Sequence, residues 1–186
     1  ATLGAPAAGG QPMSRRLLAW CLLAAWTVWA VALQSLLAGA AAPHFSWVPE
    51  LAPVMLLALA SRLETRDLPL AAVVVGLARA ACGLEPPAAV FFGLLILAGG
   101  LRILRGVLEL EGPATRAVIA GLAVFVLVLW FEAVHSLRQG LVPESLPWLA
   151  FMRMALASSL AALLLAPAIR SLPGLSPLFM RRRSAW

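Results

Sequence analysis

Six ionisable side chains lie inside or beside apolar stretches of this chain, where water cannot solvate a charge. An arginine at the centre of a bilayer costs roughly 2.5–3.5 kcal/mol on insertion scales, so such residues mark sites of pairing or function. The chemistry predicted here is ion pairing, in which Arg79 or Arg153 takes a carboxylate from a neighbouring helix, with Glu132 as the favoured partner. The whole set comprises Glu50, Arg79, Glu85, Glu132, His135 and Arg153.

Two other interpretations of these charges stay open. The arginine side chain is long enough to extend to the membrane surface, which would leave Arg79 and Arg153 unpaired and Glu132 at the interface. The charges could also line a ligand pocket that opens outward, together with Trp130 and Trp148. The three interpretations differ in whether Arg79 is buried against a carboxylate, exposed at the surface, or part of a cavity.

Residues for enzyme chemistry are scarce. Asp67 is the only aspartate, so paired-metal phosphotransfer has no set of ligands. Ser158 and Ser159 lack the glycine flanks of a nucleophilic serine, and His44 and His135 lie in a loop or at the end of an apolar segment. The two serines suit helix packing, or donation to a backbone carbonyl one turn earlier.

Cysteine usage and phosphate-binding motifs add no further chemistry. Cys21 and Cys82 form no CxxC or Cys/His cluster and are expected to be small buried side chains. A glycine-rich loop followed by lysine, the usual signal for nucleotide binding, is missing from the sequence. We therefore expect a protein that is not an enzyme and that needs no cofactor or metal.

Composition indicates the environment in which these residues act. Among the 186 residues, 62% are hydrophobic and the mean hydropathy is +0.95, too apolar for a water-soluble domain of this size. The formal net charge is +6, but the arginines alternate with apolar segments instead of gathering on one exposed face. These features predict an all-α integral membrane protein and exclude nucleic acid as a partner.

Six apolar segments are predicted to span the membrane as helices. They cover residues 17–42, 50–61, 68–83, 85–104, 115–134 and 147–169. The second is the weakest, being short and interrupted by Pro53, and Asp67 is a candidate N-cap for the third. A short interfacial helix is expected over 102–116.

The six spans make one transmembrane domain over 15–172, flanked by two polar segments. Residues 1–14 are predicted to be disordered, and 173–186 to be a basic cytoplasmic tail. The first span ends in AGAAA, which resembles the cleavage site of a signal peptide. Its apolar part is longer than is usual for a signal peptide, so we expect a helix that is retained.

Arginines are distributed unevenly between the two sides of this topology. The opposite loops hold only Arg138, whereas the other side holds eleven arginines: Arg15, Arg16, Arg62, Arg66, Arg102, Arg105, Arg116, Arg170, Arg181, Arg182 and Arg183. By the positive-inside rule, the arginine-rich side and both termini are cytoplasmic. The six ionisable side chains then fall in the outer half of the membrane.

Two further sets of residues could contact partners. Small residues at helical spacing form smooth faces for helix packing or for a partner helix, at Ala72, Gly76 and Ala80 and at Ala117 and Gly121. A cytoplasmic basic surface is expected to meet anionic lipid or an acidic protein filament. Its members are Arg62, Arg66, Arg102, Arg105 and Arg116.

Several stretches resemble a known family. These are the PEL start of the second span, PLAAVVVGLARAACG in the third, GLEPPAAVFFGLLILAGGLR in the fourth and SSLAALLLAPAIRSL in the last. Together they resemble the rod shape-determining protein MreD over residues 17–172. The chain departs from that family in carrying Arg79 where an acidic residue is common, and Glu50 where Asp is common. Any shared purpose of that acidic residue would then have moved to Glu132.

The resemblance implies a non-catalytic membrane scaffold of the bacterial cell-elongation machinery, in the inner membrane. Such a protein would bind MreC and, directly or through it, the MreB filament, the glycan polymerase RodA and its partner transpeptidase. A homo-oligomer stays open. The alternative is a substrate-binding membrane subunit of a vitamin transporter of the energy-coupling factor type. That alternative requires an outward cavity large enough for a vitamin.

Overall fold

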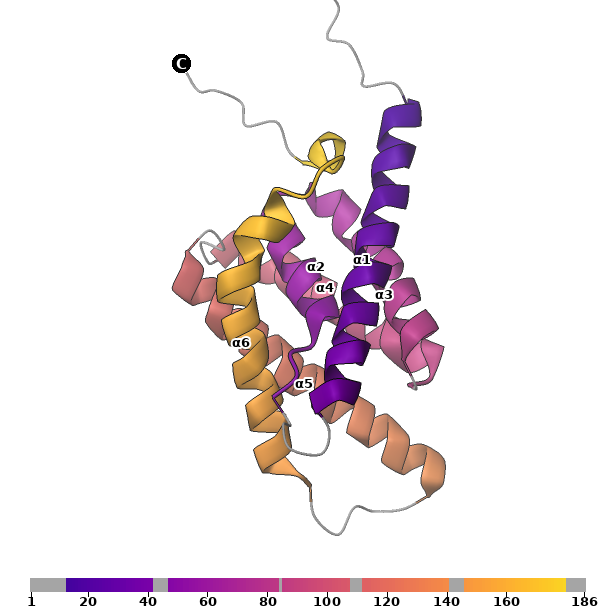
Figure 1. Ribbon diagram of the computed structural model, residues 1–186, viewed down its shortest axis with the longest axis vertical. Helices are drawn as coiled ribbons and strands as arrows, with labels where there is room; N and C mark the ends of the chain where they lie inside the picture. The colour runs from indigo at the N-terminus through magenta and orange to yellow at the C-terminus, as the bar shows by residue number, and fades with distance from the viewer. Residues whose placement is uncertain (1–12, 42–46, 84, 108–111, 141–145, 180–186) are drawn as a thin grey trace, which may run out of the picture.

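The computed structural model describes residues 13–41, 47–83, 85–107, 112–140 and 146–179, and over these it is all helical (Figure 1). Its α-helices are α1 (Met13–Ala41), α2 (Leu51–Ala60), α3 (Leu68–Cys82), α4 (Pro87–Val107), α5 (Pro113–Gln139) and α6 (Trp148–Arg170). Two short 3-10 helices, η1 (Thr65–Asp67) and η2 (Ser176–Leu178), complete the described elements.

Four of the described helices, α1, α4, α5 and α6, are long and apolar enough to cross a membrane. The other two are shorter, with 10 residues in α2 and 15 in α3. At 1.5 Å per residue these two rise roughly 15 and 22 Å, less than the ~30 Å of a bilayer core. The prediction of an all-α protein with membrane-spanning helices is confirmed at this level.

Helix α2 forms the centre of the bundle. All ten of its residues are buried, and it contacts each of the other five α-helices. Its sequence, LAPVMLLALA, has no polar face, as expected for a helix enclosed on every side. Pro53 does not interrupt it, because it lies at the third helical position, where the missing N–H has no intrahelical acceptor.

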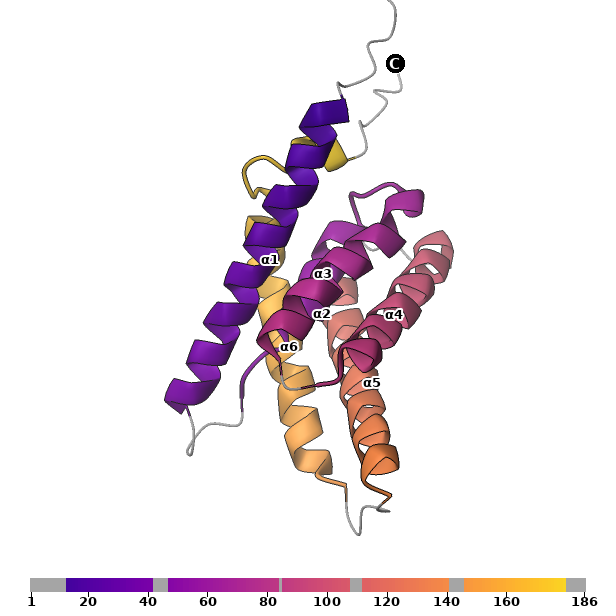
Figure 2. The ribbon, with the colours of Figure 1, turned by 90° about the vertical axis from the view of Figure 1, so that its right-hand side faces the viewer.

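The helices run alternately up and down, so the described ends of the chain lie at the same end of the molecule (Figures 1 and 2). We call this the basic end, because Arg16, Arg62, Arg66, Arg105 and Arg170 lie there. After α6 the chain turns at Gly174, whose φ is 84°. It then packs back on α1 through η2. Leu175 and Leu178 are buried in this contact, so residues 173–179 of the expected tail are folded.

Most predicted boundaries lie within a few residues of the observed ones. The exception is the interfacial helix over 102–116, which was wrong for the residues described: 102–107 continue α4, and 113–116 begin α5. Ser14, placed in the disordered lead-in, belongs to α1. Residues 1–12, 108–111 and 180–186, including the arginines at 181–183, lie outside the described residues.

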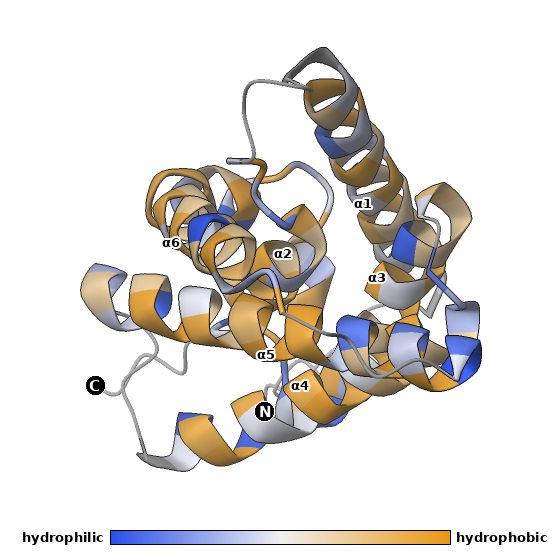
Figure 3. Cartoon of the chain, turned by 90° about the horizontal axis from the view of Figure 1, so that it is seen from below, coloured by the Kyte–Doolittle hydropathy of each residue, from blue (hydrophilic) through white to orange (hydrophobic). Residues whose placement is uncertain are grey.

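The long helices are mostly apolar, as the prevailing orange in Figure 3 shows, and many of their large apolar side chains face outward. Large side chains such as Ile103, Leu122 and Leu164 are exposed. In water such a surface would drive association, but in a bilayer it contacts lipid chains without cost. The charged side chains that enter the bundle therefore need partners within the protein.

Candidate functional site

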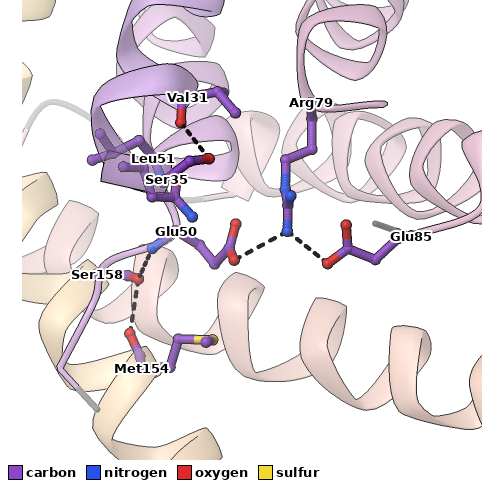
Figure 4. A network of polar contacts seen from close by, with 9 residues as sticks. Val31, Ser35, Glu50, Leu51, Arg79, Glu85, Met154 and Ser158 are labelled. Carbon is purple, nitrogen blue, oxygen red and sulfur yellow. Dashed lines mark hydrogen bonds and ion pairs between the residues drawn. The ribbon is translucent and has the colours of Figure 1, made fainter. Parts of the chain in front are cut away.

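A buried cluster of three charges lies where the chain enters α2 (Figure 4). Arg79 Nη2 lies 3.2 Å from Glu50 Oε1 and 2.8 Å from Glu85 Oε1. Arg79 is 9% exposed and Glu50 is 6% exposed. The arginine is therefore paired inside the protein, and the interpretation that it extends to the surface was wrong.

Local structure brings these three residues together from separate elements. Glu50 is the N-cap residue of α2, and Arg79 lies in the last turn of α3. Glu85 follows the turn at Gly83, where an added Cβ would lie 2.5 Å from both Arg79 Nη1 and Glu85 Oε2. The φ of Gly83 is −103°, which any residue can adopt, so glycine is required here for space and not for conformation.

The prediction that Glu132 pairs with Arg79 was wrong. Helix α3 packs against α1, α2 and α4, whereas Glu132 and His135 lie on α5 and Arg153 on α6. His135 is exposed and shares a hydrogen bond of 2.7 Å with Gln139. Glu50, Arg79 and Glu85 thus come together, while Glu132, His135 and Arg153 lie on α5 and α6. The sequence did not reveal that Glu85, six residues further along the chain, lies beside Arg79.

The N-terminal end of α2 is hydrogen-bonded by side chains from other helices. The backbone N–H of Glu50 donates to Ser158 Oγ at 2.9 Å, and that of Leu51 donates to Gln34 Oε1 at 2.8 Å. The first N–H groups of a helix have no intrahelical acceptor, and inside a membrane they have no water either. Gln34 on α1 and Ser158 on α6 thus satisfy a helix that begins in the protein interior.

The buried cluster carries more acceptors than donors. Two carboxylates face one guanidinium, and Glu50 Oε2 and Glu85 Oε2 have no hydrogen-bond partner among the described residues. The negative charge of Glu50 at the start of α2 interacts favourably with the positive end of that helix. Chemically, the site can hold helices together and accept one more donor.

Arginines from other helices donate hydrogen bonds at the C-terminal end of α2. Arg170 from α6 donates to Ser61 Oγ at 2.6 Å and more weakly to Ala58 O at 3.5 Å. Arg105 from α4 donates to Leu63 O at 2.6 Å, in the segment that follows α2. Both contacts satisfy carbonyl or hydroxyl oxygens near a helix C-terminus, where positive charge is favourable. The central helix is therefore held at both ends by its neighbours.

Asp67 occupies the N-cap position of α3, as predicted, but its carboxylate makes no cap hydrogen bond. It pairs instead with Arg16 Nη2, at 2.5 Å. The pair joins the start of α1 to the start of α3 and is partly buried. An arginine counted only as a topology signal is thus also a contact between helices.

The predicted basic surface is smaller than expected. Arg62, Arg66 and Arg102 are exposed, with Arg62 over the Phe179 ring at 5.8 Å. Arg105 is half-buried by its contact with the segment after α2. Arg116 is only 8% exposed, so assigning it to the surface was wrong. Its Nε donates to Gly112 O at 3.3 Å, and its Nη1 has no partner among the described residues.

Both small-residue faces are used for packing within the chain. A Cβ added to Gly76, which lies between buried Ala72 and half-buried Ala80, would be 3.0 Å from Phe91 Cδ1 on α4. Gly121, four residues after half-buried Ala117, lies against Ser159 and against Ala155 O of α6. Helix packing, one of the two roles predicted for these residues, is what the described chain shows.

The predicted serine hydrogen bonds are confirmed. Ser158 Oγ donates to Met154 O at 2.8 Å, and Ser159 Oγ donates to Ala155 O at 3.0 Å. The sequence did not reveal that Ser158 also accepts a hydrogen bond from the backbone at the start of α2. It also gave no indication that Gln34 accepts one there. The available signal was that Gln34 is the only amide side chain in the first apolar span.

Cysteines and metal ligands give no further site. Cys21 is exposed and Cys82 is half-buried, so neither is the fully buried residue that was expected. Within the described ranges, no group of three or more His, Cys, Asp or Glu residues is placed to hold a metal ion. Comparison with protein-family models, curated proteins and solved structures finds no match. Function must therefore be argued from the chain's own residues.

Proposed function

We propose that this chain is a non-catalytic membrane scaffold of the bacterial cell-elongation machinery, of the kind that MreD represents. It would lie in the inner membrane with six crossings and both termini in the cytoplasm. MreC would be its direct partner, with MreB, RodA and the partner transpeptidase reached directly or through MreC. Two features support this proposal: the sequence resemblance, and the pairing of the buried charges with one another inside the bundle.

One observation carries the proposal: the charged cluster of Glu50, Arg79 and Glu85 is used to hold helices together. These three residues pair with one another, and the nearby Gln34 and Ser158 bond to the start of α2. What the long helices offer to their surroundings is an apolar surface, suited to lipid and to other helices. A protein built in this way recruits partners through shape and does not need to turn over a substrate.

Six crossings are compatible with the short second helix. The four non-helical residues 47–50 precede α2, and an extended chain covers up to about 3.3–3.6 Å per residue. Together with the roughly 15 Å of α2, this segment reaches about 28 Å, close to the ~30 Å of a bilayer core. Non-helical backbone at membrane depth is tolerated where protein encloses and bonds it, as Gln34 and Ser158 do here.

One cavity of the described chain does not fit the transporter alternative. It lies between α4 and α5, has a volume of about 270 Å³ and is lined by apolar side chains and glycine. None of Glu50, Arg79 or Glu85 lines it. A vitamin site would need polar groups converging on the ligand, and here the strongest candidates for that task bind one another.

The proposal is tested by photo-crosslinking in native membranes. A photoreactive amino acid is placed at exposed positions on separate helices, such as Leu18, Phe92 and Leu164, and at the fully buried Leu56 as the control. We expect a UV-dependent adduct with MreC from at least one exposed face and none from position 56. Tagged full-length protein purified in mild detergent should also retain MreC and peptidoglycan polymerases.

Each other outcome is informative. Adducts with ATPase subunits would overturn the scaffold assignment in favour of transport. Adducts that contain only a second copy of this chain would indicate a homo-oligomer without MreC, which also contradicts the proposal. The pattern of positive positions would identify which helix face binds the partner.

A further inference from the structure

The α4–α5 groove is the apolar cavity of about 270 Å³ between these two helices. It narrows at Gly93, where an added Cβ would lie 2.7 Å from Leu127 Cδ1. It widens toward the basic end, where a Cβ added to Gly100 would meet nothing within 4 Å. Its lining residues are Gly93, Ile96, Leu97, Gly100, Leu101, Leu104, Ile119, Leu122, Ala123, Val126, Leu127 and Trp130.

The groove has a buried floor and an open side. Leu101 and Leu127 are buried, whereas Ile96 and Leu122 at the rim are exposed. Trp130 closes the narrow end, and its Nε1 donates to Ala89 O at 2.9 Å, which fixes the ring. An elongated apolar molecule could therefore enter from the side but could not pass the narrow end.

A buried cation lies beyond the wide end of the groove. Arg116 is one turn before Ile119, on the side of α5 that lines the groove further along. It is more than nine-tenths buried, yet its Nη1 has no hydrogen-bond partner among the described residues. The positive end of the α5 dipole lies at the same place. A buried guanidinium with an unsatisfied N–H group is costly unless an anion completes it.

We infer that this groove binds one acyl chain of an anionic phospholipid whose phosphate contacts Arg116. The 14 residues from Arg116 to Trp130 rise roughly 21 Å. That length exceeds the ~15 Å of hydrocarbon in one leaflet, half of the ~30 Å core, so one acyl chain fits along the groove. The inference depends only on the membrane-spanning helices and not on the elongation role.

The site is tested by native mass spectrometry of the full-length protein, with phosphatidylglycerol and phosphatidylcholine of identical acyl chains. We expect one tightly retained phosphatidylglycerol, preferred by about tenfold or more over phosphatidylcholine, because only phosphatidylglycerol brings a net negative charge to Arg116. Arg116→Gln should remove most of that preference. Arg116→Lys, which keeps a point charge, should restore part of it.

Two adjacent glycines provide a matched pair of variants for the groove. Gly100 lines it, whereas neighbouring Gly99 does not, and a Cβ at either position would meet nothing within 4 Å. Gly100→Leu should lower retention of both lipids, while Gly99→Leu should leave both unchanged. Because both replacements add the same side chain to the same helix, a difference between them cannot come from helix propensity.

Several results would overturn the inference. These are equal retention of the two lipids by the wild-type protein, an unchanged preference in the Arg116→Gln variant, or equal behaviour of the Gly99 and Gly100 variants. Displacement of the lipid by soluble glycerol phosphate would indicate a phosphate site that needs no acyl chain. A groove covered by a second copy or a partner helix would show as a dimer or complex that retains no lipid. If Arg116→Gln fails to fold, Arg116→Lys and the glycine pair still decide the question.

Discussion

Arg79 and Arg116 are almost equally buried, at 9% and 8% exposed, but their surroundings differ completely. Arg79 lies between two carboxylates, at 3.2 and 2.8 Å. Arg116 has one weak bond to a backbone carbonyl within its own helix turn, at 3.3 Å. Burial alone therefore does not tell whether a charge is structural. The partners do: two carboxylates of the same chain pair with Arg79, whereas Arg116 Nη1 has no partner among the described residues.

Replacing Arg79 should have the largest effect on stability. Arg79→Met leaves the buried Glu50 carboxylate and the partly buried Glu85 carboxylate without a cation, and breaking a buried ion pair typically costs about 3–5 kcal/mol. The triple variant Arg79→Met, Glu50→Gln, Glu85→Gln should recover much of this loss, because no charge is then left unpaired. Thermal unfolding in detergent, followed by circular dichroism, measures both.

Arg116→Met is the matched control for that experiment. It removes a cation with no carboxylate partner among the described residues, so in lipid-free detergent it should cost less than about 1 kcal/mol. Equal losses for the two arginine variants would show that the distinction between completed and uncompleted arginines is wrong.

Filling the space beside the Arg79 guanidinium should have the next largest effect on stability. Gly83→Ala puts a methyl group 2.5 Å from Arg79 Nη1 and Glu85 Oε2, so the pair must shift or break. Forcing extra volume into a packed site typically costs about 1–3 kcal/mol. Gly99→Ala adds the same methyl group to open space and should be neutral, or stabilising by up to about 1 kcal/mol. Unfolding midpoints of the two variants provide the comparison, and no difference between them would count against a tight contact at Gly83.

The sequence predicted the helices better than their contacts. Apolar length identified all six helices to within about five residues at each end, since this signal is local. The partner of Arg79 could not be derived in this way, because Glu50 reaches it through a non-helical segment inside the bundle. The depth argument used to choose Glu132 placed residues along the membrane normal but contained no information on which helices are neighbours.

The character of α2 illustrates the same limit. Its apolar composition was visible, and so was Pro53, but both suggested a weak span and not a central, fully enclosed helix. Gln34 and Ser158 make that position possible by bonding to its first N–H groups. A single amide or hydroxyl in an apolar span was the only signal in the sequence, and it does not indicate which helix end it will meet.

Replacing Ser158 should lower stability moderately, and replacing its neighbour Ser159 should change stability little. Ser158→Ala leaves the buried N–H of Glu50 without an acceptor, which typically costs about 1–3 kcal/mol. Ser159→Ala removes only a bond to a carbonyl one turn earlier, so it should change stability by less than about 0.5 kcal/mol. Hydrogen exchange at the start of α2 should rise in the first variant only. Equal exchange in both would mean that Ser158 does not cap α2.

The smallest effect is expected for an arginine pair that water reaches. Arg66 Nε lies 2.5 Å from Glu64 Oε2, so the two groups are in close contact. Their side chains are nevertheless 70% and 40% exposed. Exposed pairs contribute about 0–1 kcal/mol and are screened by salt, so Glu64→Gln should cost at most about 0.5 kcal/mol and nothing in 1 M salt. The cost of Arg79→Met should depend much less on salt, because the Arg79 and Glu50 side chains are only 11% and 8% exposed. Salt dependence of the two variants' unfolding midpoints thus measures whether an arginine belongs to the protein interior or to its surface. A salt-sensitive Arg79 would show that water and ions enter the start of α2.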